Sequence, residues 1–334
     1  MTMAAWLQKR GVALLAAVAA VGVLIALPFT GLDSFYLRIV SFALINLIVV
    51  MGLVVLYGYS DQISLASAAF YGIGAYAMAY VTSVLGLSPF IGIAAALVIC
   101  AAFGLLIALP ALRLQSHYLA MGTMAFSLLA SWSFAEAEPL TGGVDGTVSG
   151  LLFPAGTPPW AAYLFILLVA LVLVAIVRNL TTGAPGLAMR ALGANDPGAR
   201  ACGVSIEPIK VRAHIFAAVC AGLGGALYAG IVGYIGPSLF GPATSILFLG
   251  MAIIGGRNSL AGPIVATAAL TFVQYLALII PDLSDTARSL LQNLETDFYA
   301  LALILLVLFA PKGLGALLKR RAAQQDEQQN GTSV

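Results

Sequence analysis

Residues 36–57 read YLRIVSFALINLIVVMGLVVLY, a run of 22 residues in which Arg38 is the only charged side chain. A run of this length can cross the hydrocarbon core of a bilayer, which takes roughly 20 apolar residues in a helix. The rest of the chain has the same character. Of its 334 residues, 61% are hydrophobic and 8% are charged, whereas a soluble domain carries about 25% charged residues. The sequence therefore predicts an all-α polytopic membrane protein.

Apolar runs bounded by turn or charge signals predict about ten membrane helices in all. We expect them at residues 11–29, 36–57, 64–86, 89–112, 118–135, 159–177, 211–235, 243–256, 261–280 and 297–310. The run 243–256 is short for a full crossing, so eight spans remain possible if two short segments are re-entrant. On this division, residues 11–310 form the membrane domain, between an N-terminal segment at 1–10 and a partly disordered polar tail at 311–334.

The charges in the loops orient these helices. If the N-terminus lies in the cytoplasm, 13 of the 15 basic residues fall inside, and only Arg38 and Arg288 fall outside. Short cytoplasmic loops carry an excess of Lys and Arg, so this arrangement satisfies the positive-inside rule. We therefore expect both termini to be cytoplasmic and the Gly- and Thr-rich loop at about 136–158 to lie outside.

Several classes of function are disfavoured by what the sequence lacks. It has no GxxxxGK[ST] phosphate loop and no HExxH or GxSxG motif, so neither ATP hydrolysis of that type nor these catalytic reactions are expected on this chain. Its three cysteines and two histidines lack metal-ligand spacing. A net charge of +2 argues against nucleic acid as a partner. Few ionisable residues lie within the spans, which disfavours an ion-coupled carrier, although a sodium site built from backbone carbonyls would leave little trace.

Small and polar residues around the third span offer two interpretations. Gly72 and Gly74 remove side-chain bulk, which permits either close helix packing or a groove for a substrate. Gln62 and Ser64 can hydrogen-bond either a neighbouring helix or a substrate, and the helix is the commoner partner. We retain these four residues as a possible translocation pathway. Residues 71–90 also align with 221–240 at a constant offset, as a weak repeat whose two helices would run parallel.

The most distinctive soluble stretch is GLAMRALGANDPGARACGVSIEPIK, residues 186–210. Its alanines and leucines favour two short helices separated by a turn at 195–198. Asp196 would cap the second helix, with Pro197 at its first position. Gly203 follows where a helix C-terminus favours a residue of positive φ. The pattern alone leaves two interpretations equally open: a plain loop, or a knob that docks in a partner's groove.

This stretch resembles the cytoplasmic coupling segment of ABC-importer permeases of the branched-chain amino acid class, the LivM-type family. Leu187 departs from the family's Arg, and Arg200 from a usual acid. The matching positions are Gly186, Ala188, Arg190, Ala191, Asn195, Ala199, Ala201 and Gly203. Other blocks resemble the family in the same order along the chain, namely GYSDQISLASAAFYGIGAY (58–76, with Asp61 where Gly is common), LRLQSHYLAMGTMAF (112–126), LTGGVDG (140–146), GGRNSLAGP (255–263) and LFAPKGL (308–314).

The resemblance implies an ABC-importer permease fold in a bacterial cytoplasmic (inner) membrane. It also implies a complex, within membrane lipid, with a second LivH-like permease chain, two LivG/LivF-like ABC ATPase chains and a periplasmic or surface substrate-binding protein. ATP would be used by the ATPase chains, so this chain would be a transporter subunit with no cofactor of its own and not an enzyme. Its coupling segment, about 186–204, would contact the ATPase through Gly186, Arg190, Ala191, Asn195, Ala199, Ala201 and Gly203.

Leucine, isoleucine and valine are the usual cargo of this family and the substrates we expect. Similar permeases move urea, short amides or other amino acids, and selectivity in such importers lies largely in the binding protein. Two other classes stay open. An ion-coupled secondary carrier would transport without ATP or partner chains. An integral membrane enzyme would need polar catalytic residues clustered at one depth, and the sequence does not offer such a cluster.

Overall fold

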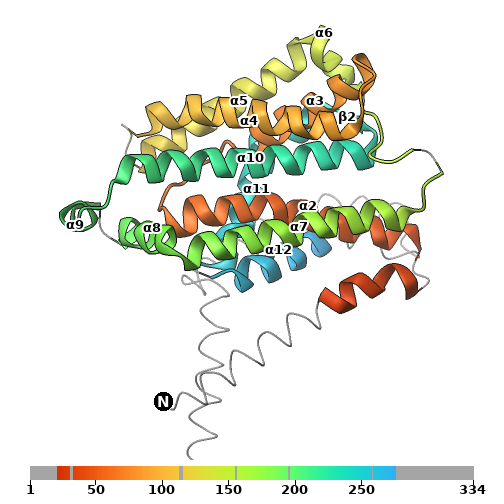
Figure 1. Ribbon diagram of the computed structural model, residues 1–334. Helices are drawn as coiled ribbons and strands as arrows, with labels where there is room; N and C mark the ends of the chain where they lie inside the picture. The colour runs from red at the N-terminus through yellow and green to blue at the C-terminus, as the bar shows by residue number, and fades with distance from the viewer. Residues whose placement is uncertain are drawn as a thin grey trace, which may run out of the picture.

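The computed structural model describes residues 21–30, 33–112, 116–154, 156–194, 196–257 and 259–275, and within these ranges the chain is almost wholly helical (Figure 1). The expected helix at 297–310 and the tail at 311–334 lie outside the described residues. So do most of the first expected helix and the end of the ninth. The helix count of ten and the cytoplasmic position of both termini therefore stay predictions.

The long helices match the expected spans closely. Two of them start with proline at the first helical position, where the missing N–H costs no hydrogen bond. The order along the chain is η1 (Leu27–Thr30), α2 (Ser34–Leu53) with the π-helical continuation η2 (Val54–Tyr59), α3 (Ser67–Ala79) with η3 (Tyr80–Val84), α4 (Pro89–Ala111), α5 (Ser116–Glu136), α6 (Glu138–Thr141), η4 (Gly143–Asp145), β1 (Thr147–Val148), α7 (Pro159–Thr182), α8 (Ala184–Ala194), α9 (Asp196–Ala201), α10 (Ile206–Val232), β2 (Tyr234–Ile235), η5 (Pro237–Phe240), α11 (Pro242–Gly255) and α12 (Ala261–Gln274).

Five of the described helical stretches are long and apolar enough to cross a membrane. They are Ser34–Tyr59, Pro89–Ala111, Tyr118–Glu136, Pro159–Thr182 and Ile206–Val232. The helices α11 and α12 are apolar but have only 14 residues each, so the shortness expected of the 243–256 run is confirmed. Large apolar side chains on α4 and α5, such as Leu106 and Leu129, are more than half exposed, as expected of helices that face lipid.

Helix α3 lies in the middle of the bundle. All of its residues except Ile73 and Ala77 are buried. Its backbone touches that of α10, because a Cβ added at Gly74 would strike the carbonyl oxygen of Gly222, and one at Gly225 would strike that of Tyr71. Glycine at these positions allows the closest helix approach in the bundle, in the manner usual for packed membrane helices.

The contacts along α10 also give the relative directions of its neighbours. Gly74 of α3 packs against Gly222, and Met78, one turn later, lies near Gly230 further along α10. The contacting residues move toward the C-terminal end of both helices, so α3 and α10 run parallel. This is the relative direction expected for the two segments of the weak repeat. Contacts of α4 with α10 run in the opposite order, from Gly104 near Ala218 back to Cys100 near Gly222.

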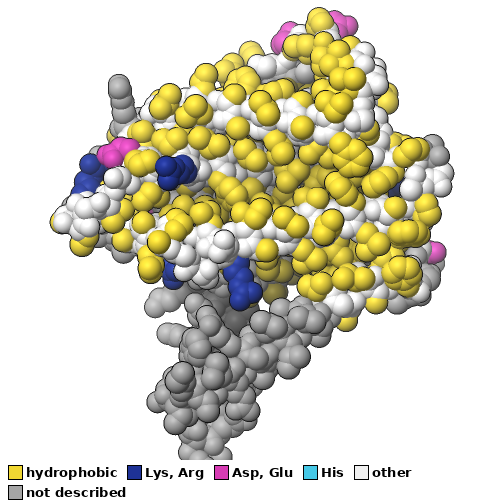
Figure 2. All heavy atoms as spheres, in the orientation of Figure 1, with side chains coloured by type: hydrophobic (Ala, Val, Ile, Leu, Met, Phe, Trp, Pro, Cys, Tyr) yellow, Lys and Arg dark blue, Asp and Glu magenta, His cyan; other side chains and the backbone are white. Residues whose placement is uncertain are grey.

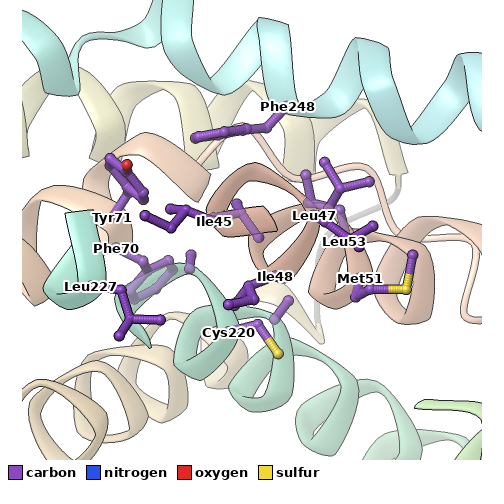
Figure 3. Packing of buried hydrophobic residues seen from close by; sticks show 14 of the residues in the cluster. Ile45, Leu47, Ile48, Met51, Leu53, Phe70, Tyr71, Cys220, Leu227 and Phe248 are labelled. Atoms are coloured by element: carbon purple, nitrogen blue, oxygen red, sulfur yellow. The ribbon is translucent and has the colours of Figure 1, made fainter. Parts of the chain in front are cut away.

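The core between these helices is apolar (Figure 3). Ile45, Ile48 and Met51 of α2 gather with Phe70 of α3 and Leu227 of α10, and each is at most 3% exposed. Beyond this core, at the end of the bundle away from α8 and α9, the two short strands pair antiparallel through Thr147–Ile235 and Val148–Tyr234. The sequence pattern did not predict these strands, and they tie the loop after α6 to the end of α10.

Candidate coupling site

The helices α8 and α9 lie at one end of the bundle, between α7 and α10 (Figure 1). Two short helices were expected here, and the structure confirms both. The expected turn at 195–198 was too long, since α9 already begins at Asp196; Asn195, between the helices, is not described. The end of α9 also follows the prediction, since Gly203 has a φ of 77°. Its N–H donates to the carbonyl of Arg200, and the N–H of Val204 donates to that of Ala199. This is the Schellman pattern, which favours glycine for its freedom to adopt positive φ.

Helix α8 has two unlike faces. Met189 and Leu192 are 4% and 2% exposed and anchor it on the bundle. On the other side, Leu187 is 64% exposed, and Ala191, one turn later, is also exposed. Residues four apart in a helix lie on one face. The helix therefore presents a small apolar surface, Leu187 with Ala191, that no described residue covers.

Gly186 and Arg190 hold α8 against the end of α7. A Cβ at Gly186 would strike the backbone of Thr181, so only glycine permits this approach. The Arg190 guanidinium donates through Nη2 to the Thr181 carbonyl at 2.7 Å and through Nε to the Gly186 carbonyl at 3.2 Å. Its central carbon also lies 6.0 Å from the ring centroid of Tyr59 in η2, within range of a cation–π contact. Arg190 thus joins α7, α8 and η2.

Helix α9 is tied to the start of α10. Arg200 donates to the Glu207 carboxylate at 2.7 Å, and both side chains are more than half exposed. An exposed pair of this kind contributes roughly 0–1 kcal/mol. Ala199 is buried at 4% exposure, whereas Ala201 and Gly203 are exposed. Of the residues predicted to contact an ATPase, Gly186 and Ala199 therefore pack inward, and Arg190, Ala191, Ala201 and Gly203 face outward.

The connection from η2 to α3, residues 60–66, is irregular and lies at the same end of the bundle. Asp61 has a φ of 52° and is the one non-glycine residue with positive φ among the described residues. Its carboxylate forms an ion pair with Arg257, just after α11. The Arg257 guanidinium also lies 5.2 Å from the ring centroid of Tyr57 in η2. The connection is thus held to the segment that follows α11.

Three further helices hold this connection through hydrogen bonds. The Gln62 side-chain amide donates to the Lys210 carbonyl of α10 at 3.5 Å. The Leu65 N–H donates to the Thr123 hydroxyl of α5 at 2.9 Å. The Ala68 N–H, at the start of α3, donates to the Ser245 hydroxyl of α11 at 2.9 Å. Non-helical backbone at this depth is tolerated when other parts of the protein satisfy its polar groups, as they do here.

The four residues proposed for a pathway are all involved in packing. Gln62 and Ser64 are 5% and 3% exposed. A Cβ at Gly72 would meet the rings of Phe134 and Phe240, and Gly74 faces the α10 backbone. Ser64 lines a cavity of about 10 Å³, which is too small for an amino acid. Whether any of the four contacts a substrate in another conformation stays a prediction.

The structure adds residues to this site that the sequence did not single out. Tyr59 contacts Arg190, the Thr123 hydroxyl accepts from the Leu65 N–H of the 60–66 connection, and the Ser245 hydroxyl accepts from the Ala68 N–H in the first turn of α3. Nothing in the chain order points to Thr123 or Ser245, because they lie 58 and 177 residues from their partners. Leu187 was noted only as a departure from the family pattern, although it is the large apolar side chain of the exposed face of α8.

Charge is distributed unevenly between the two ends of the bundle. In Figure 2 most of the Lys and Arg side chains in view lie toward the end that carries α8 and α9, together with one acidic side chain, and other acidic side chains lie at the α6 region. The exposed acids there are Glu136, Glu138 and Asp145. Basic residues gather in cytoplasmic loops, so the uneven charge agrees with a cytoplasmic position of α8 and α9.

Comparison with known proteins identifies the family. Residues 35–310 match the model of the family described as branched-chain amino acid transport system / permease component. The chain is 28% identical over 303 residues to the high-affinity branched-chain amino acid transport system permease protein LivM of Salmonella typhimurium, and equally to that of Escherichia coli K12. In both cases the alignment covers 83% of this chain and 69% of the relative. No solved structure matches the chain significantly. The chain therefore belongs to the family of branched-chain amino acid transport permease components, and its apolar helices are those of a multi-pass membrane protein.

Proposed function

We propose that this chain is a membrane-spanning subunit of an ATP-driven importer and that α8 and α9 form its contact with an ATPase chain. The observation that carries the proposal is the exposed Leu187–Ala191 surface on a helix that is otherwise fixed to the bundle. A small apolar knob on a rigid support suits insertion into a groove of another protein.

The contacts of α8 and α9 provide a route for motion from such a contact into the membrane helices. Arg190 joins α8 to η2, the end of the α2 span. Arg200 joins α9 to Glu207 at the start of α10. Displacement of the α8–α9 pair by an ATPase dimer would therefore act on α2 and α10 together. Helix α10 packs against α2 at Gly52 and against α3 at Gly74, so a change in the positions of α2 and α10 can alternate access across the bundle.

Branched-chain amino acids are the proposed cargo, supported by the family and by the names of the LivM relatives, which are branched-chain amino acid permeases. Urea, short amides and other amino acids are the alternative cargo for the same mechanism. The remaining partners would be a second permease chain and a substrate-binding protein. The end with α6 and the paired strands is the proposed contact with the binding protein, because it lies opposite α8 and α9 and carries exposed acids.

The test is a reconstituted transporter that contains this chain, its second permease, the ATPases and the binding protein. Ala191→Trp adds bulk to the exposed face without disturbing buried residues, and it should abolish ATP hydrolysis stimulated by loaded binding protein. Asn179→Trp is the matched control, since Asn179 is exposed on α7 at the same end of the bundle. Unchanged stimulation in Ala191→Trp, or equal loss in both variants, would contradict docking through α8.

The same vesicles distinguish the ion-coupled carrier. Uptake of leucine should require ATP and the binding protein and should survive an ionophore. Uptake by this chain alone that collapses with the ionophore would support the carrier. Competition by isoleucine, valine, urea and acetamide then ranks the cargo, since the preferred substrate displaces labelled leucine at the lowest concentration.

A further inference from the structure

A buried histidine faces a small cavity beside the start of α3. His214 of α10 is 1% exposed, and neither of its ring nitrogens has a hydrogen-bond partner among the described residues. It lines the cavity of about 10 Å³ together with the hydroxyl-bearing Ser64 and Ser67. The apolar part of the lining is Leu53, Leu56, Phe70, Ala217 and Ala218, and every lining residue is buried.

Burying an imidazole without a partner is costly, about 1–3 kcal/mol for a polar group in a protein interior. A neutral imidazole has one N–H donor and one acceptor nitrogen, and each serine hydroxyl can both donate and accept. The three side chains therefore supply complementary groups around one space. A space of roughly 10–15 Å³ accommodates a single water, provided that two to four polar groups surround it.

The location of the cavity favours the same occupant. Ser67 is the first residue of α3, and the N-terminus of a helix carries a partial positive charge that favours the oxygen of a water. The Ser64 hydroxyl already accepts from the Ala66 N–H at 3.4 Å, so it has its proton free to donate. No charged side chain lines the cavity, and a metal ion would lack the oxygen ligands that it requires.

We propose that His214, Ser64 and Ser67 bind one ordered water, which bridges α10 to the start of α3. The bridge adds a polar contact between two helices whose other contacts are apolar or between backbones. It lies one turn beyond Lys210, whose carbonyl accepts from Gln62. The 60–66 connection is thus bound to α10 at two successive turns, directly at the first and through water at the second.

The direct test is a map of the assembled transporter at a resolution that shows ordered waters. We expect one peak within hydrogen-bond distance, about 2.7–3.2 Å, of a His214 ring nitrogen and of the Ser64 or Ser67 hydroxyl. A map without the peak, or with the imidazole bonded directly to a protein group, would overturn the proposal. This outcome does not depend on transport, so it is separate from failure of the proposed function.

Thermal unfolding of the complex supplies the second test. If water satisfies the imidazole, His214→Leu lowers Tm, and Ser67→Ala then lowers Tm less in His214→Leu than in the wild type. Ser41→Ala is the control, because Ser41 lies buried on α2, away from the cavity, and its hydroxyl donates to its own helix. The change in Tm that Ser41→Ala causes should be the same in the wild type and in His214→Leu. A raised Tm in His214→Leu, or full additivity with Ser67→Ala, would contradict the bridge.

Two further measurements complete the design. His214→Gln retains a polar group that can bind the water, so its Tm should fall less than that of His214→Leu. If the leucine variant does not assemble, the glutamine variant still tests the proposal. Replacing sodium and potassium by choline at constant ionic strength should leave Tm unchanged. A Tm that rises with sodium or potassium in the wild type but not in His214→Leu would assign the site to a cation and overturn the proposal.

Discussion

The guanidinium of Arg190 in α8 stacks over the ring of Tyr59 in η2, with 6.0 Å between its central carbon and the ring centroid. The two residues come from the two parts of the chain that the sequence marked as candidate sites, the 186–204 segment and the stretch around Gln62. The structure places them in contact. Arg190 therefore links α8 directly to the end of the α2 span.

Replacement of Arg190 by lysine tests this contact. Arginine reaches two carbonyls and an aromatic face with one planar group, which an ammonium cannot do. Arg190→Lys should weaken coupling by about 1 kcal/mol, or roughly fivefold in stimulated ATP hydrolysis. Arg178→Lys is the control, since Arg178 is exposed on α7. Equal activities of the two variants in the reconstituted complex would show that charge alone matters.

Asp61 offers a test of backbone strain. Its φ of 52° suits glycine, which is the residue that the LivM-type pattern has at this position. Asp61→Gly loses an exposed ion pair with Arg257, worth roughly 0–1 kcal/mol, and relieves a conformation that costs on the order of 1 kcal/mol. It should therefore be close to neutral. Asp61→Ala loses the pair and keeps the strain, so its Tm should be clearly lower.

Arg257→Gln separates the two contributions to that result. Like Asp61→Ala, it removes the ion pair and leaves residue 61 in its strained conformation, so its Tm should be close to that of Asp61→Ala and below that of Asp61→Gly. A glycine variant as unstable as the alanine variant would mean that the ion pair, and not the backbone, dominates at this position.

The approach of α3 and α10 gives the largest expected stability effect. A methyl group at Gly74 or Gly225 would meet backbone atoms that cannot rotate away. Overpacking of this kind costs typically 1–3 kcal/mol, and here the helices must separate. Both Gly74→Ala and Gly225→Ala should lower the yield and Tm of the complex. Gly236→Ala should be tolerated, since a Cβ there meets nothing within 4 Å. Tolerance at Gly74 would mean that α3 and α10 are further apart in the membrane.

Much of this architecture could be predicted because its cause is local. Apolar runs of 20 residues specify helices by composition, and the Gly203 signal specifies the end of α9 through positive φ. The start of α10 at Ile206, five residues before the expected 211, shows the limit of this approach. The first turns of α10 contain charged residues such as Glu207 and Lys210, so the apolar pattern did not reveal that they are helical. These turns continue the apolar span into the aqueous boundary.

The contacts of the site could not be predicted in the same way. Leu65 meets Thr123, and Ala68 meets Ser245, because the broken backbone before α3 needs acceptors that only folding brings near. A threonine or serine that accepts a hydrogen bond from distant backbone has no distinctive sequence pattern in an apolar helix. Ser64 was identified as a polar residue near the third span, but the sequence did not connect it with His214, 150 residues further along the chain. The structure shows that His214 is buried beside Ser64, because it lies on the side of α10 that faces α2 and α3.

Gln62 is where the pathway interpretation and the packing interpretation make opposite predictions. Its amide donates to the Lys210 carbonyl at 3.5 Å and its side chain is 5% exposed, so we expect it to brace the connection and not to contact cargo. Gln62→Leu removes the donor, and Gln62→Glu replaces it with a group that repels the carbonyl. Both variants should lower the maximal rate of leucine uptake and leave the KM and the leucine-to-isoleucine preference unchanged. A shift in KM or in preference would mean that the amide contacts the amino acid during transport, since a brace remote from the substrate has no means of distinguishing leucine from isoleucine.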